Sequence, residues 1–214
     1  MTGPLWVVSI GLTLGGCSSN DQPKPTVAES PSAPKQVVDV PVPALLDRPS
    51  LFINGDAGRV VLGMAEKDAL AQFPKPAGAS EVREPPPGLA STITASGWEG
   101  KSGGFAVLAK EGSVVLAMRT IDNVSKESVI DLREGYATAI GNRIRPRDVG
   151  DDDAGFRFWI DGQTQLMIVW SRDLKKRLSV SIALGSVPLM QALRMDERFA
   201  KLDLDKMREH LAGK

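Results

Sequence analysis

Apolar and small polar residues alternate most regularly between positions 178 and 184. The apolar members of this run are Leu178, Val180, Ile182 and Leu184, and serine or alanine stands between them. A period of two is typical of a β-strand that buries one face. Apolar runs at 105–110, 113–120, 156–160 and 165–170 predict further strands, and a Glu111-Gly112 turn joins the first two into a hairpin.

A different period, with apolar residues three or four positions apart, runs over residues 126–140. This spacing predicts a helix, with Ser125 as its N-cap and Gly141 at its end. A shorter helical pattern covers residues 65–73, where prolines follow. The other predicted elements are a hairpin over 51–62 and helices over 188–195 and 203–211.

The two halves of this region resemble each other at an offset of 60 or 61 residues. Residues 65–70 align with 125–130, the segment from Trp98 aligns with that from Trp159, and 105–109 align with 166–170. Repeats over 60–120 and 121–185 would place two helices against one sheet. The alternative is two unrelated helix-plus-hairpin segments. Either way, we predict a single α+β domain over residues 51–214, an antiparallel sheet with helices packed on one face.

The segment 60–74, with Gly63-Met64-Ala65 before the helix and Phe73-Pro74 after it, resembles the SmpA/OmlA outer-membrane lipoproteins. Those share a helix-plus-sheet unit with the β-lactamase-inhibitor-protein fold. The resemblance implies an envelope binding module with no catalytic apparatus. Ala65 stands where that family has a hydroxyl N-cap, so the first helix should lack a capping bond worth about 1 kcal/mol.

The N-terminus has the anatomy of an export signal. An apolar run over residues 5–14 is followed by Gly15, Gly16 and Cys17, the only cysteine. The run is too short to span a bilayer as a helix. Its end resembles the lipobox of bacterial lipoprotein precursors, although residues 2–4 carry no lysine or arginine. The resemblance implies removal of residues 1–16 and diacylation of Cys17, which would anchor the protein in a membrane.

Residues 17–50 should form a lipidated tether. The segment is rich in proline and poor in large apolar residues, which favours extended backbone over a packed core. Its length could reach roughly 100 Å at about 3.3 Å per residue. Ser18 stands where many lipoproteins retained in the inner membrane have aspartate. The resemblance therefore favours anchoring in the outer membrane, with the domain facing the periplasm.

Charge and cysteine content narrow the function classes. The 26 basic and 26 acidic residues balance, which argues against nucleic-acid binding, because neutralising phosphates needs an excess of cations. Acylation of Cys17 would leave no thiol for a disulfide, a nucleophile or a metal site. His210 is the only histidine and makes a poor catalytic base. We expect no cofactor and no metal.

Two motifs resemble ligand sites but have simpler interpretations. Residues 95–102 resemble a relaxed phosphate loop, but a strand pattern follows where that loop needs a helix. A glycine-rich turn in a sheet is therefore favoured. The four aspartates of the acidic stretch could bind calcium, but their spacing is not that of an EF-hand, so we predict a solvated turn pairing loosely with nearby arginines. The aspartates are Asp148, Asp151, Asp152 and Asp153, and the arginines are Arg143, Arg145 and Arg147.

The tryptophans are the candidate binding residues. Trp98, Trp159 and Trp170 could form an exposed aromatic platform for a partner, or they could fill the core. In residues 165–170 both alternating sets are apolar, so both faces of that strand should be covered. The second face would meet a terminal helix, a second layer or a partner.

From these patterns we expect a lipid-anchored, non-catalytic protein-binding or scaffolding module of the cell envelope. The alternatives are a periplasmic hydrolase that uses carboxylates and a lipoprotein that binds a small apolar ligand between sheet and helices. Converging carboxylates with raised pKa values would favour the hydrolase. An uncovered apolar sheet face would favour a protein partner, and a deep apolar cavity would favour the ligand.

Overall fold

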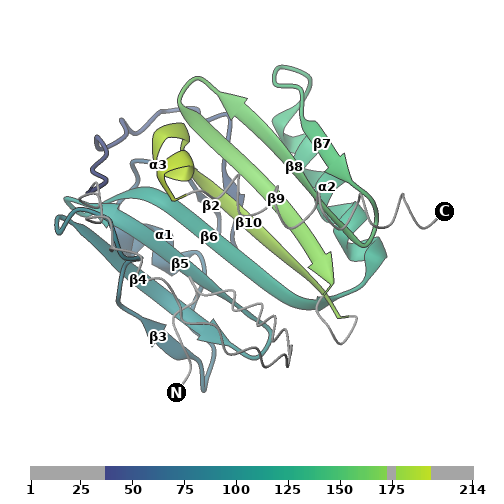
Figure 1. The fold of residues 1–214 in the computed structure, drawn as a ribbon, viewed down its shortest axis with the longest axis horizontal. Coiled ribbons are helices and arrows are strands. Elements are labelled where there is room, and N and C mark those ends of the chain that lie inside the picture. The colour runs from purple at the N-terminus through teal and green to yellow at the C-terminus, as the bar shows by residue number, and fades with distance from the viewer. Residues whose placement is uncertain (1–36, 173–176, 194–214) are drawn as a thin grey trace, which may run out of the picture.

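The computed structural model describes residues 37–172 and 177–193. Cys17, His210 and the helix predicted over residues 203–211 lie outside this range. The described chain forms an eight-stranded sheet in the order β3-β4-β5-β6-β10-β9-β8-β7, in which every neighbouring pair is antiparallel (Figure 1). Together with three helices, this architecture confirms the predicted α+β class.

The elements follow one another as two units of one helix and four strands. The first unit comprises α1 (Glu66–Ala71), β3 (Ser80–Val82), β4 (Ile93–Gly100), β5 (Gly103–Lys110) and β6 (Ser113–Val124). The second comprises α2 (Lys126–Ile140), β7 (Arg147–Gly150), β8 (Ala154–Asp161), β9 (Thr164–Arg172) and β10 (Leu178–Ser186). A hairpin of β1 (Ile53–Asn54) and β2 (Arg59–Val60) precedes them, and α3 (Val187–Ala192) follows.

The two units have the same topology at the offset that aligned their sequences. Trp98 is opposite Phe105 in the β4–β5 hairpin, and 61 residues later Trp159 is opposite Leu166 in the β8–β9 hairpin. The last strands of the two units, β6 and β10, pair at the centre of the sheet, so one continuous sheet joins the two units.

The two equivalent helices differ in their caps as the sequence predicts. Ser125 accepts a hydrogen bond from the backbone N–H of Ser128 at 3.1 Å, whereas Ala65 at the N-cap of α1 has no side-chain bond. The helices also differ in length, with 6 residues in α1 and 15 in α2. The first unit therefore covers less of its sheet with helix than the second.

The two faces of the sheet have different covers. On the helix face, α1, α2 and the β1–β2 hairpin bury one core that contains Trp159 and Tyr136. On the opposite face, Leu189 and Met190 of α3 pack in a second core with Val40. In Figure 1, α3 lies in front of the sheet, and α1 and α2 lie behind it. The second face of the sheet was expected to meet a terminal helix, a second layer or a partner, and the short helix α3 supplies part of that cover.

The Pro-rich segment joins the domain earlier than predicted. Val40 is 3 % exposed, and the Nζ of Lys110 on β5 lies 2.8 Å from a carboxylate oxygen of Asp39. The backbone of Val38 also bridges to Leu89. Residue 51 is therefore too late as the start of the domain, because residues 38–40 already contact the sheet.

Tyr136 connects α2 to the first hairpin. Its hydroxyl oxygen accepts a hydrogen bond from the backbone N–H of Asn54 at 2.8 Å, and its side chain is 2 % exposed. Burial raises the pKa of Tyr136 to about 12, partly opposed by that hydrogen bond and by Arg59. The neutral phenol is thus favoured in the folded state.

This pKa predicts a loss of stability at alkaline pH. An unfolded tyrosine ionises near pH 10, whereas folded Tyr136 stays neutral until about pH 12. The neutral Tyr136 should therefore contribute about 2 to 3 kcal/mol to the free energy of unfolding below pH 10, and this contribution should disappear as the pH rises to 12. Urea unfolding of the wild type and of Tyr136→Phe across this range measures it. The prediction would be contradicted if the free energy of unfolding of the wild type fell no more steeply with pH than that of the variant.

No helix within the described residues has both the length and the apolar character needed to cross a membrane.

Candidate functional site: an apolar pocket at the edge of the sheet

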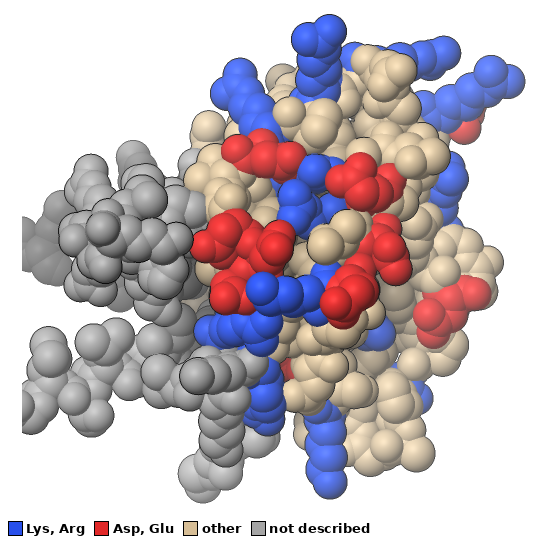
Figure 2. Space-filling model, turned by 90° about the vertical axis from the view of Figure 1, so that its right-hand side faces the viewer, with Lys and Arg blue, Asp and Glu red and all other residues tan. Residues whose placement is uncertain are grey.

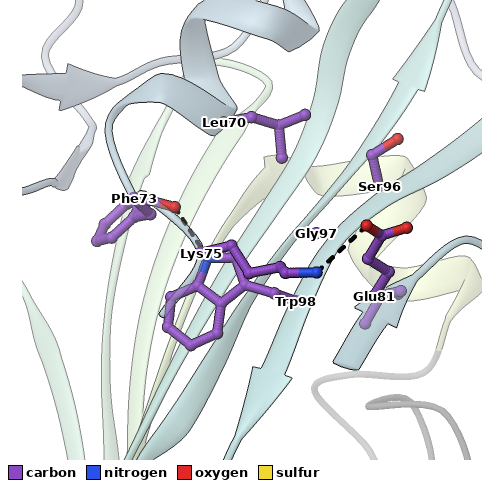
Figure 3. Close-up of a pocket in the computed structure, with 8 residues that line it drawn as sticks. Leu70, Phe73, Lys75, Glu81, Ser96, Gly97 and Trp98 are labelled. Atoms are coloured by element: carbon purple, nitrogen blue, oxygen red, sulfur yellow. Dashed lines mark hydrogen bonds and ion pairs between the residues drawn. The ribbon is translucent and has the colours of Figure 1, made fainter. Parts of the chain in front are cut away.

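An open pocket of about 270 Å³ lies where α1 meets the outer strands β3 and β4. Its walls come from the end of α1, the loop after it and both strands (Figure 3). We call it the edge pocket. The residues that line it are Leu70, Phe73, Lys75, Glu81, Val82, Ser96, Gly97 and Trp98.

Aromatic contacts hold the inner wall of the edge pocket. The Nε1–H of Trp98 donates to the carbonyl oxygen of Phe73 at 2.8 Å, which ties β4 to the loop after α1. The Phe73 ring lies 4.2 Å from that of Phe105. The guanidinium of Arg119 lies 5.0 Å from the Trp98 ring and 5.1 Å from the Phe73 ring. Burial lowers the pKa of Arg119, but an arginine remains charged at neutral pH. The wall is therefore fixed before any ligand arrives.

Charged side chains form one rim of the pocket. The Nζ of Lys75 lies 3.2 Å from one carboxylate oxygen of Glu81, and Arg83 bonds the other oxygen. Figure 3 shows the Lys75–Glu81 pair beside Trp98. The hydrogen bond from Arg83, followed by that from Lys75, lowers the pKa of Glu81. Glu81 is therefore a carboxylate at neutral pH, where it cannot act as a general acid.

Gly97 leaves the floor of the pocket without a side chain. Its φ of 155° is rare for other residues, and an added Cβ would lie 2.1 Å from the carbonyl oxygen of Phe105. A larger residue would therefore have to displace the neighbouring strand. Gly97 therefore allows β4 to lie this close to β5, next to the Trp98 wall of the pocket.

The second unit fills the corresponding space. At the offset of 61, Ser96 corresponds to Arg157, which is 7 % exposed and bonds Asp148 and Glu134. Helix α2 contributes Glu134, and β7 contributes Asp148. The shorter α1 and the small Ser96 supply no such cover in the first unit. The edge pocket thus arises from the difference between the two units.

Comparison of the chain with protein-family models, curated proteins and solved structures found no match.

The structure places the three candidate tryptophans in the core. Trp98, Trp159 and Trp170 are 5 %, 1 % and 2 % exposed, so the hypothesis of an exposed platform built from them is wrong. Their neighbours on the helix face exclude water, because α1 and α2 cover that side of the sheet. Only Trp98 reaches a surface feature, since it lines the edge pocket. The sequence feature that could have distinguished Trp98 from the other two tryptophans is Gly97, directly before it.

The phosphate-loop resemblance corresponds to a hairpin. Residues 95–100 belong to β4, Lys101 and Ser102 form the turn, and β5 starts at Gly103. No helix follows the turn, so its N–H groups do not form a phosphate cradle. The predicted glycine-rich turn in a sheet is confirmed.

The acidic stretch pairs with cations other than those predicted. Asp148 bonds Arg157, and Asp153 lies 2.8 Å from Arg172 and 3.1 Å from Lys126. The prediction of loose pairing with Arg143, Arg145 and Arg147 is wrong, because Arg157 and Arg172 on the neighbouring strands lie closer. Figure 2 shows acidic and basic side chains interleaved at this end of the molecule. Within residues 37–172 and 177–193, no three potential ligand side chains converge on a metal site.

Proposed function

We propose that this protein is a lipid-anchored envelope module that binds a protein partner without catalysing a reaction. Cys17 would carry the anchor, and the following Pro-rich segment would hold the domain at a distance from the membrane, with Ser18 favouring the outer membrane. The observation that supports partner binding most strongly is the edge pocket, an open apolar recess with a preformed aromatic wall.

The size of the edge pocket favours one apolar side chain of a partner. Pockets for small molecules typically enclose about 300–1,000 Å³ and bury most of the ligand, whereas this pocket holds about 270 Å³ and opens to solvent. Protein interfaces commonly seat one bulky anchor in such a recess and surround it with polar groups. Leu70, Phe73 and Trp98 would contact the anchor, and the Lys75–Glu81 pair would form the polar rim.

The electrostatics favour binding over carboxylate catalysis. Among the described residues, every carboxylate with a resolved pKa shift has its pKa lowered: Asp39, Glu81, Glu127 and Asp153. Three of these shifts come mainly from a basic partner, and that of Glu127 from a hydrogen bond to its own backbone. A hydrolase of the carboxylate type needs one acid with a raised pKa. Instead, Asp39, Glu81 and Asp153 form surface ion pairs, and Glu127 lies in the first turn of α2.

A photoreactive side chain at the rim of the pocket tests the proposal. Benzoylphenylalanine in place of Lys75, in cells that express the full chain, should give one discrete protein adduct on irradiation. The same group in place of Lys67, which is exposed on α1, serves as the matched control and should give none. Adding Ser96→Phe, which fills the pocket, should abolish the adduct at position 75. Identical adducts at both positions, or none at position 75, would reject the proposal.

A further inference from the structure

A second surface lies at the other end of the sheet, on the face opposite α1 and α2. It combines two exposed apolar side chains and one half-buried phenylalanine with three exposed arginines, and we call it the basic–apolar surface. Its members are Arg143, Arg145, Arg147, Val149, Phe158 and Ile160. Strand β7 forms the outer edge of the sheet here, and β8 is its neighbour.

Strand alternation places the apolar members of this surface on one side. In β8, Arg157 and Trp159 turn toward α2, so Phe156, Phe158 and Ile160 turn to the opposite face. Val149 on β7 is opposite Phe156 and shares that face. Ile160 is 44 % exposed and Val149 36 %. The two exposed apolar side chains thus lie on the same face of the sheet as Arg147.

The three arginines lie along the same edge. Arg147 is opposite Phe158, and its guanidinium lies 6.0 Å from the Phe158 ring. Arg145 and Arg143 precede β7 and are exposed. At about 3.3 Å per residue, Arg145 lies within roughly 7 Å of Arg147 along the backbone. Among residues 37–172 and 177–193, none of the three is in an ion pair.

Three acids near this end form ion pairs on the helix face. Asp148 and Glu134 bond Arg157 on the helix face, and Asp153 bonds Lys126 of α2. The outer strands therefore carry ion pairs on the helix face and Arg147 beside apolar side chains on the opposite face. Arg143 and Arg145 lie in the loop that leads into β7. Apolar side chains flanked by arginine are the composition of surfaces that lie on anionic lipid, where the apolar groups enter the headgroup region.

We propose that the basic–apolar surface binds the headgroup region of an anionic lipid bilayer. This inference rests on the proposed function, since the Cys17 anchor would hold the domain close to a membrane and raise the local concentration of lipid. Strands β3 and β7 are the two edges of the sheet, roughly 34 Å apart for seven spacings of about 4.8 Å each. The edge pocket thus remains accessible while the other end lies on lipid.

Sedimentation with lipid vesicles tests this inference. The chain from residue 17 onward, with Cys17→Ser, removes the acyl anchor and the apolar leader, neither of which takes part in any contact described above. It should bind phosphatidylcholine vesicles that contain phosphatidylglycerol, and bind pure phosphatidylcholine vesicles at least tenfold more weakly. High salt should release it, because the Debye length falls from about 10 Å at 0.1 M to about 3 Å at 1 M.

Two sets of variants locate the contact. Neutralising Arg143, Arg145 and Arg147 to glutamine should weaken binding by about fivefold for each residue, and by roughly a hundredfold together. The matched control neutralises three exposed cations elsewhere, in Arg48→Gln, Lys67→Gln and Lys101→Gln, and should change binding less than tenfold. Ile160→Ser, at an exposed position, should weaken binding severalfold without unfolding the protein.

Several results would overturn the inference. These are equal affinity for both vesicle types, an equal loss in the control triple variant, and a failure to bind vesicles while the domain dimerises through Ile160. If palmitate labelling of Cys17 and the adduct at position 75 persist in any of these cases, the proposed function stands and only the lipid contact is rejected.

Discussion

Replacing Cys17 with serine should abolish incorporation of radioactive palmitate into the protein. The chain has one cysteine, so no second thiol can replace it. A serine hydroxyl is a far weaker nucleophile than a thiol at neutral pH, because a thiol is partly ionised there and a hydroxyl is not. The variant should also move from the membrane fraction to the soluble fraction, because two acyl chains are the usual requirement for stable anchoring.

The control for this experiment is Ser18→Ala, which changes the next residue and keeps the thiol. It should label as strongly as the wild type. Undiminished labelling of Cys17→Ser would show that the acyl group is attached elsewhere, and the anchor proposed for this protein would be wrong. Loss of labelling in both variants would instead indicate that the segment as a whole is needed for processing.

Truncating Trp159 to alanine should produce the largest loss of stability of any single side chain discussed here. Its side chain is 1 % exposed, and its ring lies 6.5 Å from that of Tyr136 on α2. Removal of a fully buried tryptophan typically costs about 3–5 kcal/mol, because the transfer free energy is lost and a cavity remains. Urea unfolding followed by circular dichroism measures the change, and a loss below about 1 kcal/mol would contradict the packing described for α2.

Trp159→Phe separates ring volume from the indole N–H. Within the described part of the chain, the Nε1 of Trp159 is buried without a hydrogen-bond partner. A buried unpaired donor costs about 1–3 kcal/mol, so phenylalanine removes that cost while it keeps most of the ring. We therefore expect a loss much smaller than for alanine. Trp98→Phe, which breaks the bond to Phe73, should cost more than Trp159→Phe.

The elements with the strongest periodicity were predicted closely. The helix expected over 126–140 is α2, and the hairpin expected over 105–120 is β5 with part of β6. Apolar and small polar residues alternate along β10 because α2 and the other elements of the helix face bury one side of the strand. Helix α3 covers residues 187–192, whereas the expected range was 188–195, the last two residues of which lie outside the described range. In each case a side chain buried on one face leaves a regular signal in the sequence.

The outer strands and the N-terminal cover were missed for a common reason. Strand β7 is exposed at all four positions, and β3 has only three residues, so neither has an apolar pattern. Val40 is buried although it lies among prolines. Edge strands pair through their backbones on one side only, and their side chains need not be apolar. Pattern analysis therefore has no signal to detect there.

The edge pocket could not have been predicted as a unit. Its residues come from α1, the loop after it, β3 and β4, and each is unremarkable in its own segment. Trp98 was identified as a binding candidate, but together with Trp159 and Trp170, which are buried and do not line the edge pocket. What distinguishes Trp98 is the short helix above it and the serine two residues before it, where the second unit has Arg157.

The sequence by itself determined the fold class, the positions of α2 and of the inner strands β5, β6, β8, β9 and β10, and the caps of the helices, because these depend on local periodicity and on residues adjacent in the chain. It also supplied the hypothesis of a lipid anchor at Cys17. Only the tertiary structure decided which apolar residues are buried and which are exposed. The pairing of β6 with β10 sets the two units side by side, and the unequal helices then leave one end open as a pocket. Likewise, only the pairing of β7 with β8 places Arg147 beside Phe158, because that neighbourhood depends on strand register and not on distance along the chain.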